Sequence, residues 1–352
     1  MKKYLFIAYL IIMTSLTLNC ESIAPLIFFN NQDFTVEYIE AVNDSIFNFQ
    51  QKVLSNQDSI TLNIQNNNFV IPLNNEFITP IDSINTNEDI IILSDIEGNF
   101  NALYSLLYNN NIIDKTGNWI FEKGHLILAG DMVDRGEFVD ETLLLLYKLD
   151  YQAFNNGGRV HYLLGNHDIM LIKGDLRYTH KKYHSLANAK NTSVDNLYNK
   201  DSLLGKWIRS KHSILKINDF LVVHAGISRE LINNNYSLNE INQLVLQYNN
   251  DNSINDRINF LLKSYGPFWF RGMMRDYKDI PKLTQNDFTK ILTYFNANKI
   301  IVGHTVVDNI SYSYQQKLIG VDVNHYENSQ GLLIKNNKLY IIYPDKEKTV
   351  LN

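Results

Sequence analysis

The feature that most constrains the fold is a repeated alternation of short apolar runs with helical patterns. The runs cover 89–93, 125–129 and 159–164, and each is followed by polar residues. After the first run, apolar residues recur at helical spacing from Phe100 to Leu107. Buried apolar strands that alternate with helices predict βαβ units and a largely parallel sheet. We therefore expect an α/β fold.

The second half of the chain continues this pattern with paired strands. Residues 213–217 and 220–224 are two apolar runs joined by the turn Asn218-Asp219, which predicts a hairpin. Helical spacing returns over 237–265, and residues 299–304 form a late apolar run. No Pro/Gly/Ser-rich linker divides the 352 residues, so we expect one main domain over 89–345.

Two segments lie outside this regular pattern. Residues 21–88 are rich in Asn with short alternating runs such as 59–64 and 68–71, and they predict a β-rich extension. Residues 173–211 form a polar insertion that we expect to be helical. This insertion is either a solvated cap or a lid that recognises an anionic substrate.

The first 20 residues have the pattern of a signal peptide. Lys2 and Lys3 precede an apolar run over 4–18, which is short for a bilayer-spanning helix. Cys20, the single cysteine, follows directly and suggests a lipoprotein signal, with membrane attachment through a lipidated Cys20. Asn19 departs from the usual small residue, so an ordinary cleaved signal or an uncleaved anchor are alternatives. We expect an exported protein of the periplasm or cell envelope.

The charge of the chain argues against nucleic acid as a partner. The formal net charge is -5 and the pI is about 6.0, so no basic field is available to attract phosphate backbones. With no thiol after Cys20, cysteine catalysis and disulfides are also excluded from the mature chain.

Polar side chains with metal-binding chemistry follow five of the apolar runs. They are Asp95 and Glu97; Asp131 and Asp134; Asn166, His167 and Asp168; His224; and His304. In an open α/β sheet, the carboxyl ends of the strands meet at one crevice where ligands bind. A mixture of oxygen and nitrogen donors suits Mn, Fe or Zn. Each residue alone is explained by a helix cap or a turn, whereas the ordered set predicts a metal site.

The motifs resemble those of the calcineurin-like metallophosphoesterases. They are Asp95-Ile96-Glu97, Gly130-Asp131-Met132-Val133-Asp134-Arg135-Gly136, Gly165-Asn166-His167-Asp168, Val223-His224-Ala225-Gly226 and Gly303-His304-Thr305. The pattern is similar to the phosphoprotein-phosphatase-like branch, and especially to bacterial Shewanella-like protein phosphatases. The resemblance implies two packed mixed β-sheets flanked by helices, with two divalent metal ions at the strand ends.

The resemblance also implies a role for each site residue. Asp95 and Glu97 would bind the first metal, Asp131 would bridge both, and the second would be held by Asn166, His224 and His304. A hydroxide shared by the metals would attack phosphorus in line. His167 would protonate the leaving oxygen with Asp168 orienting its ring, Arg135 would bind the phosphate, and Asp134 would orient a metal ligand or His167.

Three further residues have two alternative interpretations each. Arg271 is a second phosphate-binding residue or a surface residue beside an aromatic core. Asp322 and His325 follow a late strand, and they either support the metal ligands or, as we expect, belong to a turn.

Glu97 is the one departure from the family pattern, which has His at this position. A carboxylate favours a harder ion such as Mn. The outcomes are a working site with altered metal preference, which we favour, a one-metal site, or a degenerate site.

The expected function is hydrolysis of phosphomonoesters, in a phosphorylated protein (at Ser/Thr or Tyr) or a small molecule. Two alternatives stay open at this point. One is a phosphodiesterase or dinucleoside polyphosphate hydrolase, and the other is a non-catalytic surface binding protein with a degenerate metal site.

Overall fold

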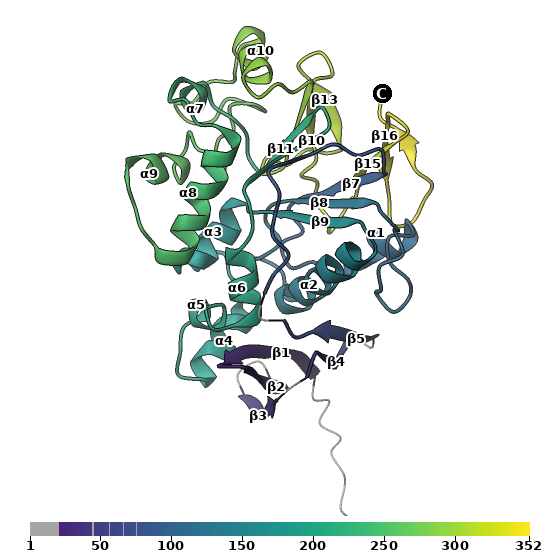
Figure 1. Ribbon diagram of the computed structural model, residues 1–352, viewed down its shortest axis with the longest axis vertical. Coiled ribbons are helices and arrows are strands. Elements are labelled where there is room, and N and C mark those ends of the chain that lie inside the picture. Colours follow the sequence, from purple (N-terminus) through teal and green to yellow (C-terminus); the bar gives the residue numbers. More distant parts are fainter. Residues whose placement is uncertain (1–20, 44–45, 56, 66, 75) are drawn as a thin grey trace, which may run out of the picture.

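Two six-stranded sheets face one another, and helices cover their outer sides (Figure 1). The computed structural model describes residues 21–352 except 44–45, 56, 66 and 75. Both sheets combine parallel and antiparallel strands. The expected α/β fold with two packed mixed sheets is therefore confirmed.

The first sheet contains the three apolar runs that opened the sequence argument. Its strands, in spatial order, are β17 (Thr349–Val350), β16 (Lys338–Ile342), β15 (Gly331–Lys335), β7 (Ile90–Leu93), β8 (His125–Ala129) and β9 (Arg159–Leu163). β7, β8 and β9 are parallel, as predicted. β15, β16 and β17 complete the sheet in antiparallel order, so the sheet is parallel only at its centre and one edge.

The second sheet is built around the predicted hairpin. Its strands are β13 (Ser311–Ser313), β14 (Leu318–Gly320), β12 (Lys299–Val302), β11 (Phe220–Val223), β10 (Ile214–Ile217) and β6 (Ser83–Ile84). β10 and β11 pair antiparallel across the turn at Asn218-Asp219, whereas β11, β12 and β14 run parallel. β6 lies before position 89 yet pairs with β10, so the second sheet includes a strand from the N-terminal segment.

The alternation of side chains along each strand divides the core in two. In β7, Ile90 and Ile92 belong to the apolar layer between the sheets, with Val222 and Ile301 of the second sheet. Ile91 and Leu93 point to the other side and join the larger cluster beneath the helices. Both faces of β7 are buried, which is why its sequence is apolar throughout.

The helices connect the strands, and several begin with a polar side-chain cap. They are α1 (Phe100–Asn109), α2 (Val139–Asn155), α3 (Asn166–Lys173), α4 (Lys181–Ala189), α5 (Val194–Leu197), α6 (Leu203–Arg209), α7 (Arg229–Asn233), α8 (Leu238–Asp251), α9 (Asp256–Leu261) and α10 (Gln285–Tyr294). The Asn99 side chain, for example, accepts a hydrogen bond from the Ala102 amide and starts α1. The insertion 173–211 contains α4, α5 and α6.

The N-terminal segment forms two small sheets against the helical side of the molecule (Figure 1). They contain β1 (Glu21–Asn30), β2 (Asp33–Asn43) and β3 (Ile46–Leu54), and β4 (Ser59–Ile64) with β5 (Asn67–Pro72). The Phe29 amide donates to the Asp201 carbonyl at 2.7 Å, and Glu37 pairs with Lys190. The three-stranded sheet is therefore attached to the insertion.

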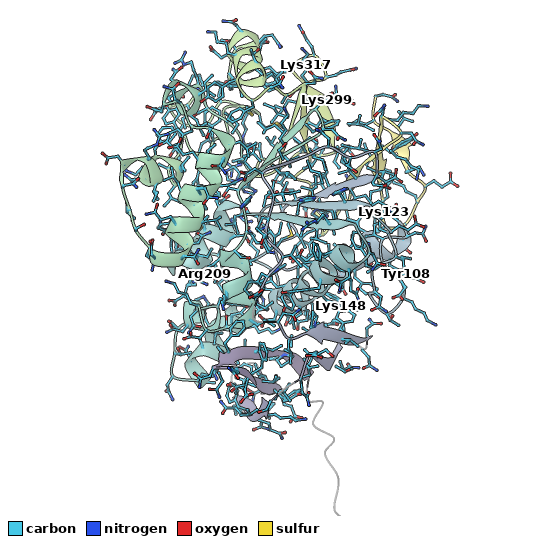
Figure 2. All side chains as sticks on the ribbon, viewed as in Figure 1. Tyr108, Lys123, Lys148, Arg209, Lys299 and Lys317 are labelled. Atoms are coloured by element: carbon cyan, nitrogen blue, oxygen red, sulfur yellow. The ribbon has the colours of Figure 1, made fainter. Side chains whose placement is uncertain are left out.

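A buried lysine joins the two-stranded sheet to α2. The Lys148 side chain is enclosed, in contrast to Lys123 at the surface (Figure 2). Its Nζ donates to the Gly117 carbonyl at 2.9 Å and lies 4.6 Å from the ring centroid of Phe69 in β5. Burial lowers the pKa of Lys148 to about 8.

Candidate metal centre and active site

The polar residues that follow the strands converge at one edge of the two sheets. Asp95 follows β7, Asp131 follows β8, and Asn166 lies just beyond β9 in the first sheet. His224 and His304 follow the parallel strands β11 and β12 in the second sheet. The carboxyl ends of parallel strands from both sheets thus meet here, as predicted.

Short distances place these residues in a single cluster. His224 Nε2 lies 2.9 Å from Asn166 Oδ1 and 3.2 Å from Asp131 Oδ2. The backbone amide of His304 donates to Asp95 Oδ2 at 3.0 Å. Ligand atoms of Asp131, His224 and His304 all lie within 4.8 Å of one another. Residues separated by more than 200 positions are therefore in contact.

The backbone around the site is bent into an unusual conformation. The non-glycine residues with a φ between 49° and 70° include Asp95, Glu97, Asp131, Asp134, Arg135 and His304. L-residues seldom adopt this left-handed region, and such positions concentrate where function requires a particular side-chain direction. The tight turns after β7, β8 and β12 direct these side chains into the cluster.

Two glycines allow the turns to approach one another. A Cβ at Gly165 would overlap the Asp131 carboxylate, and a Cβ at Gly303 would overlap Ser94 Oγ and Asp95 Oδ2. These positions therefore need glycine for space, because any side chain would displace a carboxylate of the cluster.

Burial and charge perturb the ionisable groups of the cluster. Burial raises the pKa of Asp95 to about 6. At Asp131 burial acts in the same direction, but the charges of His224 and His167 outweigh it and lower the pKa to about 2. Burial and the charge of His224 hold the pKa of His304 well below its ordinary value. The cluster thus contains a buried carboxylate and a neutral imidazole, both of which are chemical groups that can bind a metal.

The donor set fits divalent cations. Carboxylate oxygens, an amide oxygen and imidazole nitrogens are suitable ligands for Mn, Fe or Zn. Among the described residues, His304 Nε2 is buried and has no hydrogen-bond partner. A buried polar atom without a partner is uncommon, and a cation bound between His304, His224 and Asp131 would satisfy it.

Glu97 lies at the exposed side of the cluster. Its carboxylate is within 4.8 Å of ligand atoms from Asp131 and His167, and it forms an ion pair with Arg135. The position is therefore compatible with a carboxylate ligand for a metal. A bound cation and the Arg135 guanidinium would therefore compete for the Glu97 carboxylate.

His167 is oriented by Asp134, which corrects the role expected for Asp168. His167 Nδ1 lies 2.8 Å from Asp134 Oδ2, and Thr179 Oγ1 donates to Asp134 Oδ1 at 2.9 Å. The prediction that Asp168 orients this ring is wrong. The Asp168 carboxylate accepts bonds from the Gly165 and Asp131 amides and from the Tyr162 hydroxyl instead. Asp168 lies at N3 of α3, where it faces the start of its own helix.

The insertion supplies two residues that the sequence argument did not assign. The Tyr178 ring packs edge-on against His167, with centroids 5.0 Å apart, and its carbonyl accepts the Arg135 amide. Thr179 contacts Asp134 as described. Neither residue follows a strand or matches a motif, so only the folded insertion brings them to the site.

The two arginines occupy different environments. The Arg135 side chain is 46% exposed beside the Tyr178 ring, where it pairs with Glu97 and is accessible to a phosphate from solvent. Arg271 is half-buried, and its Nη1 donates to the His304 carbonyl at 2.5 Å and to Thr305 Oγ1 at 3.3 Å. Arg271 therefore lies at the site, next to a predicted metal ligand, and not on a remote surface.

Asp322 and His325 also belong to the site environment. His325 Nε2 donates to the Ser94 carbonyl at 2.9 Å, directly before Asp95. Asp322 is buried, and burial together with the nearby Asp95 raises its pKa to about 9. Both residues lie in the segment after β14 and support the cluster, which is more than the turn role that we expected.

Comparisons with known proteins agree with the geometry of the cluster. Residues 89–308 match the family model described as calcineurin-like phosphoesterase. The chain is 27% identical over 241 residues to Shewanella-like protein phosphatase 1 of Plasmodium berghei, covering 66% of this chain and 65% of that protein. It thus spans slightly less than two thirds of that relative's length.

Two further relatives are informative. The crystal structure of a cold-active protein-tyrosine phosphatase of a psychrophile Shewanella species superposes with a TM-score of 0.83 and 31% identity, covering 94% of this chain and 100% of that one. A symmetrical bis(5'-nucleosyl)-tetraphosphatase of Vibrio cholerae is 30% identical over 137 residues, or 39% of this chain and 44% of that protein. The chain belongs to the calcineurin-like phosphoesterase family.

Proposed function

We propose that the chain is a metal-dependent phosphatase that hydrolyses phosphomonoesters. The observation that carries this proposal is the meeting of Asp131, His224 and His304 in one buried cluster, with His167 beside it. Two divalent cations, when bound, would polarise a water molecule for attack on phosphorus and offset the charge of the phosphate. Asp95, Glu97, Asp131, Asn166, His224 and His304 are the residues that would hold them.

The side chains around the cluster provide phosphate binding and proton transfer. The exposed Arg135 presents a guanidinium that matches two phosphate oxygens and stabilises charge as it develops. Asp134 accepts from His167 Nδ1, which orients the ring so that Nε2 can pass a proton to the leaving oxygen. Thr179 fixes the Asp134 carboxylate through its other oxygen.

The simplest test is turnover of p-nitrophenyl phosphate by the purified chain with added Mn. We expect hydrolysis by the native chain and none above background for Asp131→Asn, because this substitution removes the charge at the centre of the cluster. A native rate equal to that of the Asp131→Asn protein would reject the proposal and favour a binding protein with a degenerate site.

We propose a phosphorylated protein as the substrate. Support comes from relatives whose names describe protein phosphatases, one of them a protein-tyrosine phosphatase that covers 94% of this chain. The competing function is hydrolysis of dinucleoside polyphosphates, which the bis(5'-nucleosyl)-tetraphosphatase match supports over 39% of the chain. Parallel rates for phosphotyrosine and phosphoserine peptides and for diadenosine tetraphosphate would separate the two.

We propose Mn as one native metal, on the ground that Glu97 adds a hard carboxylate ligand. Metal content after purification from Mn-, Fe- and Zn-supplemented cells tests this, with Glu97→His as the paired variant. We expect the native chain to retain two metals with Mn preferred, and Glu97→His to shift the preference towards Zn. Equal preference in both proteins would contradict the role of Glu97.

We also propose that the chain is exported and anchored through a lipid on Cys20. Residues 1–20 lie outside the described residues, so this proposal rests on the basic start, the apolar run and Cys20. Within the described part of the chain, none of the helices has the length and apolar character needed to cross a bilayer. Labelling with radioactive palmitate should mark the native chain and spare Cys20→Ala. A full-length, unlabelled native chain would contradict the proposal.

A further inference from the structure

A groove of about 820 Å³ opens beside the predicted phosphate-binding residue Arg135. Its walls come from the start of α1, the segment 135–138, the loop 325–329 and the segment 343–346. The groove therefore begins at Arg135 and runs away from the metal cluster along α1. This is the region where the part of a substrate that flanks its phosphate would lie.

The loop 325–329 forms a fixed wall of the groove. His325 Nε2 donates to the Ser94 carbonyl and its Nδ1 lies 2.9 Å from Ser329 Oγ. Asn328 Nδ2 donates to the Asp308 carbonyl at 2.7 Å. Tyr326, between these anchors, is 67% exposed. A large aromatic ring on a restrained loop gives contact area at low entropic cost, as in many protein-binding surfaces.

The charge of the groove is more acidic than expected for a polyphosphate site. The carboxylates of Glu137, Glu327 and Asp345 line it and are exposed. Among the described residues, no ion pair involves any of these three. Beyond Arg135, the one lysine or arginine in the lining is Lys346, whose Nζ lies 3.9 Å from the Tyr343 ring centroid. A chain of several phosphates would therefore meet uncompensated negative charge.

Glu137 and Tyr326 line the groove from two different segments of the chain. Partial burial and then the Glu137 carboxylate raise the pKa of Tyr326. Both residues contribute to the lining together with His180 of the insertion. A cationic side chain placed between these segments would find an aromatic ring and a carboxylate at once, a combination that binds Lys or Arg well.

On the basis of the phosphatase activity proposed above, we infer that this groove binds the polypeptide next to the phosphorylated residue. Glu137 and Glu327 select basic side chains in that polypeptide, and Tyr326 packs against them. The same charges disfavour dinucleoside polyphosphates. The substrate class is thus a phosphoprotein whose phosphorylated residue has lysine or arginine beside it.

Binding of fluorescein-labelled peptides to the Mn-loaded chain, followed by fluorescence anisotropy, tests this inference. Two peptides carry the same central phosphonate analogue of a phosphorylated residue and differ only in two flanking lysines or two flanking glutamates. We expect the lysine peptide to bind about tenfold more tightly, from roughly threefold for each exposed charge contact. High salt should reduce the difference, because these contacts are exposed.

Variants of the groove residues test whether the groove causes the difference in affinity between the two peptides. In the double variant Glu137→Gln/Glu327→Gln we expect the difference between the peptides to fall to about threefold or less. Glu40→Gln is the matched control, because Glu40 is an exposed carboxylate of β2 that does not line the groove and should keep the tenfold difference. Circular dichroism of the double variant would confirm that it is folded.

Three results would overturn the inference. They are equal affinities of the two peptides for the native chain, an unchanged difference in the double variant, and tighter binding of diadenosine tetraphosphate than of the lysine peptide. The binding assay needs no turnover, so it is independent of p-nitrophenyl phosphate hydrolysis. Charge-selective binding without hydrolysis would reject the proposed catalysis alone, and hydrolysis without charge selection would reject the groove alone.

Discussion

The carboxyl ends of the parallel strands and the amino-terminal halves of β8 and β9 bury ionisable side chains in different ways. At the carboxyl ends of β8, β11 and β12, ligand atoms of Asp131, His224 and His304 come together, and His304 Nε2 has no partner among the described residues. In the amino-terminal half, His125 and His161 stack with centroids 5.2 Å apart and share a 2.9 Å hydrogen bond between ring nitrogens. The second pair is neutral and satisfied within the chain.

This contrast separates a site from a structural pair. Both regions contain buried histidines, so residue type and burial alone do not distinguish them. The carboxyl ends differ because His304 Nε2 is buried there without a hydrogen-bond partner among the described residues, and a bound cation would supply one.

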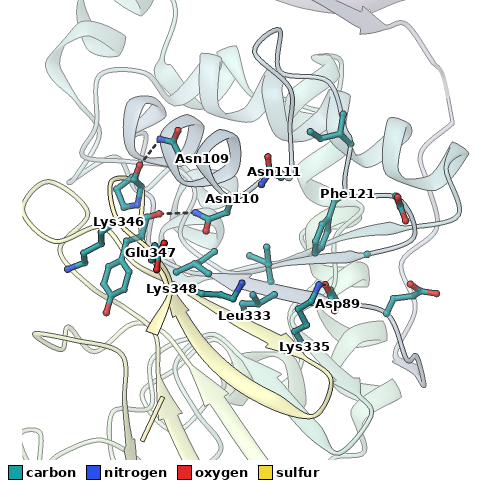
Figure 3. Close-up of a pocket in the computed structure, with 18 of the residues that line it drawn as sticks. Asp89, Asn109, Asn110, Asn111, Phe121, Leu333, Lys335, Lys346, Glu347 and Lys348 are labelled. Atoms are coloured by element: carbon teal, nitrogen blue, oxygen red, sulfur yellow. Dashed lines mark hydrogen bonds and ion pairs between the residues drawn. The ribbon is translucent and has the colours of Figure 1, made fainter. Parts of the chain in front are cut away.

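The larger of the two grooves lies at the amino-terminal ends of β7 and β8. A groove of about 1230 Å³ lies there between the segments 87–91, 109–111 and 343–348 (Figure 3). Asn110 Nδ2 donates to the Tyr343 carbonyl at 2.9 Å and closes one side of it. It contains none of the predicted metal ligands, so cavity size does not locate the chemistry in this molecule.

The largest effect on activity should come from replacing a histidine at the carboxyl ends, compared with the same replacement in the amino-terminal half. His167→Asn removes the proposed proton donor, and we expect kcat/KM on a phosphoserine peptide to fall about 10³-fold. The loss should be smaller on p-nitrophenyl phosphate, whose leaving group needs less protonation. His161→Asn, in the amino-terminal half, should stay within twofold of the native rate. Equal losses in both variants would erase the distinction between the ends.

Removal of bound metal should lower the stability of the folded chain only when the residue cluster at the carboxyl ends is intact. Ions that bind the folded state alone add about 2.7 kcal/mol when their concentration is 100 times the Kd. We expect EDTA to lower the melting temperature of the native chain and of His161→Asn, and to leave that of Asp131→Asn nearly unchanged. A melting temperature of the native chain that ignores EDTA would contradict a bound metal.

The neutral histidine pair predicts a loss of stability in acid. Burial and the neighbouring His125 lower the pKa of His161 from 6.5 to about 3. Below pH 6.5 the unfolded chain binds a proton that the folded chain excludes, so stability falls as the pH decreases from 6.5 towards 3. Between pH 7 and 5 this residue should contribute a loss of about 2 kcal/mol.

Urea unfolding of the native chain and His161→Gln at both pH values measures this contribution. The native chain should lose about 2 kcal/mol more than the variant. The same loss in both proteins would show that His161 titrates normally and would remove the neutral pair from the comparison.

The smallest effect should come from the hydroxyl that supports the proton donor. Thr179→Val keeps the shape of the side chain and removes its bond to Asp134, so we expect kcat to fall about fivefold with little change in KM. Thr289→Val is the control, since its exposed hydroxyl bonds only to the Gln285 carbonyl in α10. A rise in KM with unchanged kcat would argue that Thr179 affects binding instead.

Much of the fold and the site followed from local patterns in the sequence. The runs at 90–93, 125–129 and 159–163 are apolar because both their faces are buried, and that pattern identifies parallel strands directly. Polar residues at their ends then located the cluster. The strands β4 and β5 also matched the alternation over 59–64 and 68–71.

Contacts between distant segments were the part that could not be predicted. Thr179 and Tyr178 reach the site only because the insertion folds back over it, and no periodicity encodes that approach. The role of Asp168 beside His167 came with the family resemblance, and Asp134 was named as a residue that orients either a metal ligand or His167. Neighbours at the start of a helix point in different directions, and Asp134, 33 positions away, makes the contact instead.

The glycines of the site give a criterion for judging other chains of this kind. Gly165 and Gly303 carry no chemistry, yet an added methyl group at either would overlap a carboxylate of the cluster. A homologue that keeps every donor but has alanine at one of these two positions should therefore be inactive. Judged by its metal-binding residues alone, such a chain would be called an enzyme. The lack of space between its turns would show that it is a pseudoenzyme.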